Sequence, residues 1–244
     1  PDLSSAGIII VTAGAMYFLA GARITHLALV ILSAAVFTFF FIQTQPYAQD
    51  RVNSYQAGLV DPTQANYHTQ QAIIAFVNGG WTGVGLGQSE QKFGALPAPH
   101  TDSVFAVIGE ELGVLGASLV VVLYVVFVIR GFQIARRAVD AFGTLLGVGF
   151  TIWVAIQALL NIAVMTALIP SSGLPLPFIS YGGSALLVLM VSVGLMLSVS
   201  RVAAVRDNTS NRRATGANYD WGWGNRRSRL SRTRRRRSPA DTEA

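Results

Sequence analysis

Five stretches of mainly apolar residues, each close to twenty residues long, constrain this chain more than any other feature. They cover residues 6–22, 24–42, 104–129, 142–168 and 183–200. An α-helix needs about 20 apolar residues to cross the hydrocarbon core of a bilayer. Within that core, only helices and closed barrels satisfy their own backbone hydrogen bonds. The stretches therefore predict an all-α polytopic membrane protein with about five transmembrane helices.

The composition agrees with a membrane protein and excludes several kinds of site. Only 12% of the 244 residues are charged, about half the level of a typical soluble domain. The chain has no cysteine, which excludes disulfides, thiol nucleophiles and Cys-ligated metals. It opens on Pro1 with no basic segment before the first apolar stretch, unlike a signal peptide. We expect the chain to be a fragment whose N-terminal part is missing.

The basic residues predict the orientation in the membrane. All but two of the 18 lie at Arg23, in a turn containing Arg130, Arg136 and Arg137, or in the last 44 residues. Lysine and arginine gather on the cytoplasmic side of a membrane, so these segments should be cytoplasmic and loops 43–103 and 169–182 external. A short apolar run at 72–77 is too short to span.

The chain accordingly predicts a membrane domain over residues 1–200 and a tail over 201–244. The tail is rich in Gly, Ser and Arg, which favours a disordered basic cytoplasmic segment. Such a segment is attracted to anionic lipid headgroups. We expect membrane lipids, and no nucleic acid, as its partners.

Three carboxylates lie where the long loop meets the third apolar stretch. Asp102 has two interpretations: an N-cap of the helix that follows, or a functional carboxylate at the mouth of a cavity. At 100° per residue, Glu110 should lie about 80° from Asp102 and share its side of the helix, whereas Glu111 should point away and pair elsewhere. Spacing at Gly109, Gly113 and Gly116 predicts close helix packing.

Two segments rich in glycine or proline flank these groups. Residues 79–87, GGWTGVGLG, lack the features of a nucleotide-binding loop and predict a flexible turn or a concavity of free amides. Residues 169–184, IPSSGLPLPFISYGGS, predict a re-entrant turn that is buried or lines a cavity. Asn161 and Gln157, four residues apart in a span, should form hydrogen bonds between helices. The three histidines have no metal-ligand spacing, although His100 could orient Asp102.

Three motifs resemble those of the SEDS family, which includes FtsW, RodA and sporulation relatives. The segment GVGLGQSEQKFGALPAPHTDSVFAVIGEELG resembles the family's large extracellular loop and following helix. PSSGLPLPFISYGGSALL resembles its last-loop signature, and PDL at the start resembles its QPDLG segment. The GLGQS form resembles FtsW more than RodA. The resemblance covers about residues 1–200 and implies the C-terminal half of a ten-helix fold.

Four positions depart from the family pattern. Ser4 replaces the glycine of PDLG, and Ala185 replaces the second serine of YGGSS. Ser103 replaces the phenylalanine that usually follows HTD. Ser172 stands where some FtsW sequences have lysine, so a cationic contact there is lost or supplied elsewhere.

The resemblance implies a peptidoglycan glycosyltransferase of cell division, which polymerises lipid II at the outer face of the bacterial cytoplasmic (inner) membrane. The family's essential acid is in the HTD motif, which makes Asp102 the expected general base. The expected partners are a class B penicillin-binding protein and other divisome membrane proteins. Further candidates for substrate binding are Lys92, Arg51, His100, Glu110, Ser180, Tyr181, Gly182 and Gly183.

No motif in the chain requires a cofactor or forms a metal site, although a divalent cation, Mg²⁺ or Mn²⁺, could help to neutralise the pyrophosphate. A lipid II transporter (flippase) and a non-catalytic divisome scaffold stay open as alternatives. We expect residues 1–244 alone to be inactive.

Overall fold

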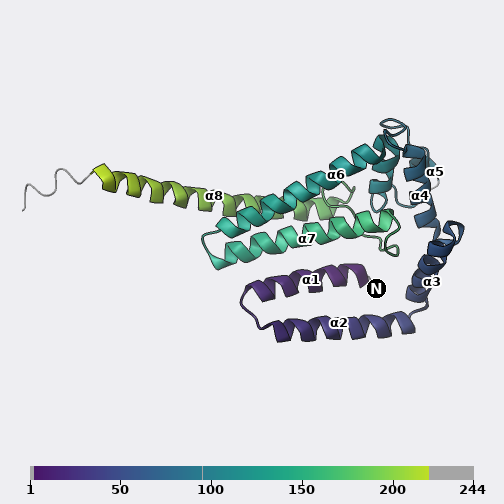
Figure 1. Cartoon of the computed structure of the whole chain (residues 1–244), viewed down its shortest axis with the longest axis horizontal. Coiled ribbons are helices and arrows are strands. Elements are labelled where there is room, and N and C mark those ends of the chain that lie inside the picture. Colours follow the sequence, from purple (N-terminus) through teal and green to yellow (C-terminus); the bar gives the residue numbers. More distant parts are fainter. Residues whose placement is uncertain (1–2, 95, 220–244) are drawn as a thin grey trace, which may run out of the picture. The chain divides into compact units, whose positions relative to one another are not determined.

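A computed structural model describes residues 3–94 and 96–219 (Figure 1), in which the regular elements are all helices. These are α1 (Leu3–Leu19), α2 (Ile24–Thr44), α3 (Pro46–Val60), the 3₁₀ turn η1 (Pro62–Gln64), α4 (Tyr67–Gly79), α5 (Gln91–Gly94), α6 (Val104–Arg137), α7 (Ala141–Met165) and α8 (Gly183–Tyr219). The chain divides into two units, Pro1–Ser200 and Arg201–Ala244. The predicted all-α fold is confirmed.

Four of the helices are long and apolar enough to cross a membrane: α2, α6, α7 and the Gly183–Arg206 part of α8. The first predicted span, 6–22, forms a shorter apolar helix, Ser4–Leu19. The predicted external loop 43–103 is largely helical, since it contains α3, α4 and α5. The run at 72–77 lies within α4, which has only 13 residues.

Local signals explain where several helices begin and end. Pro46 occupies the start of α3, where its missing N–H removes no helix bond. The Asn66 side chain caps α4 by accepting the backbone N–H of His68, and Gly80 ends that helix at a positive φ of 51°. Glycine tolerates this conformation because it has no Cβ.

One predicted boundary is wrong. Arg130, Arg136 and Arg137 lie on α6 and not in a turn, because the helix runs through Gly131 and ends only where Ala138 adopts a non-helical ψ of 144°. The predicted division at residue 200 coincides with the division between the two units, although helix α8 continues beyond it to Tyr219. Residues 220–244 of the predicted tail, and Pro1 and Asp2 of the PDL motif, lie outside the described residues.

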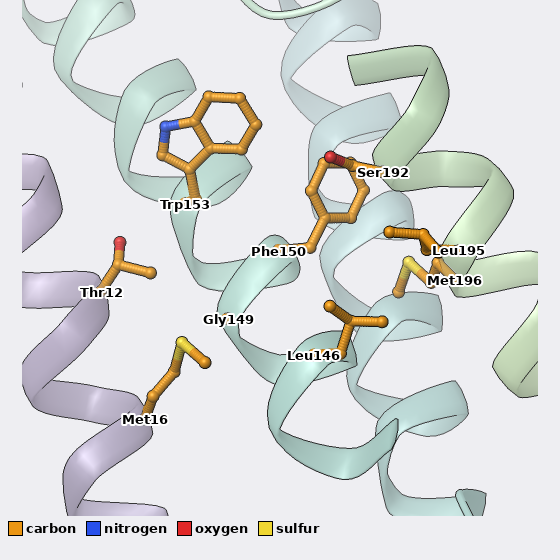
Figure 2. Close-up of a pocket in the computed structure, with 9 residues that line it drawn as sticks. All are labelled: Thr12, Met16, Leu146, Gly149, Phe150, Trp153, Ser192, Leu195 and Met196. Atoms are coloured by element: carbon orange, nitrogen blue, oxygen red, sulfur yellow. The ribbon is translucent and has the colours of Figure 1, made fainter. Parts of the chain in front are cut away.

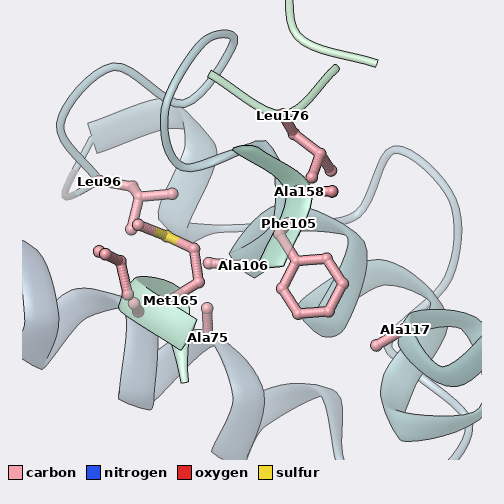
Figure 3. Packing of buried hydrophobic residues seen from close by; sticks show 10 residues of the cluster. Ala75, Leu96, Phe105, Ala106, Ala117, Ala158, Met165 and Leu176 are labelled. Carbon is pink, nitrogen blue, oxygen red and sulfur yellow. The ribbon is translucent and has the colours of Figure 1, made fainter. Parts of the chain in front are cut away.

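A hydrophobic cluster joins the short helix α4 to one end of α6 and α7 (Figure 3). Ala72 and Ala75 of α4 pack with Phe105 and Ala106 at the start of α6. Met165 at the end of α7 and the loop residues Leu96 and Leu176 complete the contact. The HTD segment, residues 100–102, lies just before α6, so this cluster anchors it to α4, α6 and α7.

Helix α6 is interrupted at Gly113, which has φ 67° and ψ −168°. The loop after α4 supplies the hydrogen bonds that the helix loses there. Val84 and Gly85 donate their N–H groups to the carbonyls of Glu110 and Glu111 at 3.0 Å, and the Gly80 and Trp81 carbonyls accept from Val114 and Leu115. These bonds satisfy backbone groups that would otherwise be unpaired.

The glycine loop 79–87 uses several of its amides to bridge the break in α6, and the N–H of Gly87 binds the Glu111 carboxylate. Its N–H groups at Gly83, Val84 and Gly85 all donate to backbone carbonyls. The predicted close packing is confirmed at Gly109, where an added Cβ would lie 2.2 Å from the Phe76 ring of α4. At Gly116 the same atom would meet only Leu112 of its own helix.

Candidate active site

The HTD segment lies just before α6, and Asp102 is not its N-cap. Ser103 occupies the cap position, because α6 begins at Val104. A turn precedes it in which the N–H groups of Thr101 and Ser103 both donate to the Ala98 carbonyl. Asp102 therefore sits in a tight turn at the helix entrance, one residue before the cap position.

Three consecutive backbone carbonyls fix this turn from the opposite side. The His100 carbonyl accepts the N–H of Tyr181 at 2.8 Å. The Thr101 carbonyl accepts the Ser180 hydroxyl at 2.5 Å, and the Asp102 carbonyl accepts Nδ2 of Asn161 at 2.8 Å. The backbone that carries the Asp102 carboxylate is thus held by α7 and by residues 179–183, the ISYGG segment.

The sequence predicted that Asn161 and Gln157 would form hydrogen bonds between helices. In the structure both side chains instead bind irregular backbone. Asn161 is 1% exposed and donates also to the Leu174 carbonyl at 2.6 Å. Gln157 donates to the Pro175 carbonyl at 3.0 Å. Segment 169–182 has no regular structure, so its carbonyls need donors from α7 at membrane depth.

The Asp102 carboxylate faces the 169–173 segment, because a Cβ added to Gly173 would lie 3.4 Å from Oδ2. Residues 169–173 form part of the wall of a cavity of about 650 Å³. The predicted role of this segment, to line a cavity, is confirmed. Asp102 is not itself among the lining residues, but its carboxylate lies next to Gly173 in the wall of this cavity.

This cavity has an apolar side and a polar end. The apolar side comes from α1, α2 and α7, and the polar end from α3 and the 169–173 segment. Its lining residues include Ile8, Val11, Phe41, Ile42, Ile156 and Leu160 on the first side, and Tyr47, Arg51, Ser171 and Ser172 at the second. The Ser172 hydroxyl oxygen is buried and has no hydrogen-bond partner among the described residues.

Arg51 brings a positive charge to the polar end. Its guanidinium donates to the Ser171 carbonyl at 2.9 Å and to the Tyr47 hydroxyl, and it lies over the Tyr47 ring at 4.4 Å from the centroid. A guanidinium has five N–H donors, so these two bonds leave others for a ligand. Arg51 lines the same cavity as Ser172, where some FtsW sequences carry lysine.

His68 of α4 is the titratable neighbour of Asp102 that sequence reasoning missed. Burial lowers the pKa of His68, the Asp102 carboxylate opposes this shift, and the Arg51 guanidinium adds to it. The three groups therefore interact electrostatically, although they are far apart in the sequence. His100, the predicted neighbour, has an exposed side chain and contributes its backbone carbonyl.

Glu110 does not share the Asp102 cavity, and that prediction is wrong. Its side chain is 1% exposed and accepts a hydrogen bond from the Ser89 hydroxyl. The angular estimate fails because Asp102 precedes the helix, so 100° per residue does not relate the two side chains. Glu111 pairs elsewhere, as predicted: its Oε1 lies 2.9 Å from the Lys92 ammonium. Lys92, a predicted pyrophosphate ligand, is engaged in this ion pair.

The ISYGG residues differ in what they offer. Ser180 uses its hydroxyl on the backbone, where it donates to Thr101 and accepts the Leu176 N–H at 2.6 Å. Tyr181 has an 85% exposed side chain. Gly182 and Gly183 form the entrance to α8, and the Gly182 carbonyl accepts the Leu186 N–H. In this set, Ser180 supports the HTD turn and Tyr181 presents a free ring.

Replacing Ser180 by alanine tests this support. The change leaves the Leu176 N–H and the Thr101 carbonyl without their partner, and a buried unsatisfied group costs about 1–3 kcal/mol. We expect thermal unfolding in detergent to begin several degrees lower. Ser184→Ala is the matched control, because Ser184 is exposed in the same motif. Equal melting of the two variants would contradict the structural role of Ser180.

A second cavity, of about 280 Å³, lies between α1, α7 and α8 (Figure 2). Thr12 and Met16 face Phe150 and Trp153 across it, with Met196 on the α8 side. No titratable side chain is among its lining residues, so it offers no acid–base chemistry. Within the described residues, no three His, Asp or Glu side chains gather as a metal site.

Comparison with known proteins places this geometry in a family. The family model described as "Cell cycle protein", which covers FtsW, RodA and SpoVE, matches residues 1–204. The chain belongs to this family. The HTD and ISYGG segments that meet at Asp102 both lie within the matched region. Family membership and the apolar helices together indicate that the chain is part of a multi-pass membrane protein.

Named relatives include both sporulation and division proteins. Stage V sporulation protein E of Bacillus subtilis is 43% identical over 204 residues, which are 82% of this chain and 55% of that protein. The probable peptidoglycan glycosyltransferase FtsW of Marinobacter nauticus is 39% identical over 228 residues, 90% of this chain and 57% of the relative. The chain thus spans about half the length of the curated relatives it matches.

A solved structure confirms the fold of this FtsW/RodA/SpoVE segment. It is a chain from work on the structural coordination of polymerization and crosslinking by a peptidoglycan synthase complex. The two chains superpose with a TM-score of 0.64 at 26% identity, over 83% of this chain and 56% of the other.

Proposed function

We propose that this segment carries the catalytic half-site of a peptidoglycan glycosyltransferase that polymerises lipid II, with Asp102 as general base. One observation carries the proposal: a carboxylate on a rigid turn stands beside an amphipathic cavity with an arginine at its polar end. Relatives named as probable peptidoglycan glycosyltransferases support it.

The shape of the cavity suits a substrate with an apolar chain and an anionic head. The apolar residues of α1, α2 and α7 would contact a polyprenyl chain. The hydrophobic effect favours the burial of such a chain away from water. Arg51 and the Ser172 hydroxyl would face the pyrophosphate. Arginine binds phosphate well because its planar donors match the phosphate oxygens. Arg51 would thus supply the cationic contact for which some relatives use lysine.

The reaction joins two lipid-linked sugars. Asp102 removes the proton from the 4-hydroxyl of the acceptor sugar, and the resulting oxygen attacks the anomeric carbon of the donor. The bond from that carbon to the pyrophosphate breaks, and the lipid pyrophosphate leaves with the electron pair. Asp102 retains the proton. A hydroxyl is a poor nucleophile at neutral pH, so a positioned base contributes about 10²–10⁴-fold.

Arg51 would stabilise the negative charge that develops on the leaving pyrophosphate. Replacing it by alanine should lower the polymerisation rate by about 10²-fold, a typical loss when one preorganised donor is removed. Arg51→Lys should lose less, because the charge remains. Lys92→Gln is the comparison, and we expect a smaller loss because Lys92 is paired with Glu111. The measurement is the polymerisation rate with labelled lipid II. A larger loss of rate with Lys92→Gln than with Arg51→Ala would contradict the role of Arg51 at the pyrophosphate.

A divalent cation could share this role if the pyrophosphate itself brings it. The described residues do not form a protein-built site for such an ion, and no step of the reaction is assigned to it. A class B penicillin-binding protein is the proposed partner, which the peptidoglycan synthase complex of the similar solved structure supports. The inner membrane, with the C-terminus in the cytoplasm, is the proposed location.

Reconstitution separates polymerase from transporter. The complete protein and its partner would be placed in liposomes with fluorescent lipid II, and glycan length and lipid II translocation would be measured in parallel. We expect glycan strands to form, and Asp102→Asn to stop them without changing translocation. Translocation that stops with Asp102→Asn would favour the transporter, and no glycan synthesis by the intact complex would favour a scaffold.

A further inference from the structure

Ser103 stands where the family usually has phenylalanine, and here it joins the HTD turn to α4. Its side chain is completely buried. Nε2 of His68 lies 2.6 Å from the Ser103 hydroxyl oxygen, and that hydroxyl lies 2.6 Å from the Pro97 carbonyl oxygen. A phenylalanine at this position could make neither bond, so this contact is a property of this chain.

The direction of the two bonds follows from counting protons. The Ser103 hydroxyl has one proton, and the Pro97 carbonyl can only accept. If the serine donated to His68 instead, two acceptor oxygens would face each other at 2.6 Å without a proton between them. The serine therefore donates to Pro97, and His68 donates its Nε2–H to the serine.

His68 is itself well placed to act as a support. Its backbone N–H donates to the Asn66 side chain that caps α4, at 3.1 Å. The next residues of α4 pack into the cluster around Phe105, with Ala72 and Ala75 fully buried. The imidazole thus rests on a rigid helix and reaches the residue directly after Asp102.

We propose that His68 is a positioning residue for Asp102, acting through Ser103, and that its neutral Nε2–H form is the competent one. The proposal rests on the proposed function, since it assumes that Asp102 is the base. Asn161 and Ser180 hold the HTD turn from one side, and His68 holds it from α4. A misplacement of about 1 Å at a reacting group can cost about 10²-fold in rate.

The charge of His68 adds a dependence on pH. The charged groups that act on it are Asp102 of the turn and Arg51 of α3. Protonation at Nδ1 would keep the Nε2–H bond to Ser103, but it would place a positive charge near both groups. That charge would stabilise the Asp102 carboxylate and weaken it as a base. The pKa of His68 is lowered mainly by burial, so the neutral form prevails at neutral pH.

The test compares three variants of the full-length protein, in complex with its partner, across pH 6 to 8.5. His68→Ala loses the donor, and kcat for lipid II polymerisation should fall by about 10- to 100-fold with KM little changed. His68→Gln keeps an N–H donor but cannot titrate. We expect it to restore most of the rate at pH 8 and to retain a larger fraction of that rate at pH 6 than the wild-type protein does.

A double-mutant cycle checks that His68 acts through Ser103. His68→Ala and Ser103→Ala together should cost no more than the larger single loss, because both remove the same contact. Additive losses would overturn the proposal, as would a rate for His68→Ala within about twofold of wild type. If His68→Ala does not fold, His68→Gln and Ser103→Ala decide, and a glutamine variant as slow as Ser103→Ala at pH 8 would overturn it.

Asp102→Asn in the same assay separates this inference from the proposed function. A full loss with Asp102→Asn but none with His68→Ala would remove only the positioning role of His68. A normal rate with Asp102→Asn would remove the proposed base and, with it, the role of His68.

Discussion

Replacement of Asp102 by asparagine is expected to lower the rate of lipid II polymerisation by about 10²–10⁴-fold, the contribution of a positioned general base. Asparagine has the same shape as aspartate but cannot take the proton of the acceptor hydroxyl. The bonds that hold residues 100–102 end on backbone carbonyls, and the substitution leaves these in place. The initial rate of glycan synthesis by the complete protein and its partner is the measurement.

A matched control is the same kind of change at an exposed carboxylate elsewhere in the segment 43–103. Glu90 is exposed, and Glu90→Gln should leave the rate unchanged. If both substitutions had equal effects on rate, the net charge of the segment 43–103 would matter more than the position of Asp102.

Replacement of Gly113 by alanine should have the largest effect on stability, about 2–6 kcal/mol from backbone strain and overpacking together. Its φ of 67° and ψ of −168° lie in a region that is essentially restricted to glycine, where other residues are strained by about 1–3 kcal/mol. An added Cβ would also lie 2.5 Å from the Gly83 nitrogen and the Trp81 carbonyl oxygen, and overpacking costs about 1–3 kcal/mol. Thermal unfolding in detergent would measure the loss.

Gly87→Ala measures the backbone part of this effect alone, so the difference between the two variants gives the steric part. Gly87 also has a positive φ, 81°, but nothing lies within 4 Å of its added Cβ. We expect Gly87→Ala to cost only the backbone term, about 1–2 kcal/mol. Equal melting of the two variants would mean that the loop 79–87 gives way without loss, and that its bonds across the break in α6 contribute little.

The sequence predicted the helices well, because about twenty apolar residues have few alternatives at a membrane. It predicted their ends less well. Nothing between residues 129 and 137 stops α6, and Ser200 does not stop α8. Composition changes at both points, but composition alone does not end a helix. A breaker or an unfavourable backbone conformation does.

The candidate site was only partly predictable, because its members come from distant segments. Asp102 was identified from the HTD motif. Arg51 was selected for its charge, and the structure gives it neighbours at Tyr47 and Ser171. His68 carried no sequence signal, since His100 is nearer to Asp102 along the chain. The position of α4 against α6 brings His68 to Ser103, and no periodicity predicts that contact.

The polar residues of α7 show a signal that could have been used. Asn161 and Gln157 were expected to join helices, but their donors satisfy the carbonyls of the irregular segment 174–175. That segment was already predicted to be re-entrant, and irregular backbone at membrane depth requires hydrogen-bond donors. Combining the two observations would have predicted the contact.

The central claim is that Asp102 acts in the chemical step of polymerisation and not in holding the substrate. The direct measurement is lipid II binding and polymerisation rate on one sample of Asp102→Asn protein in complex with its partner. We predict binding within a few-fold of wild type and a rate lower by at least about 10²-fold. A rate close to wild type, or a loss of rate that equals the loss of binding, would contradict the claim.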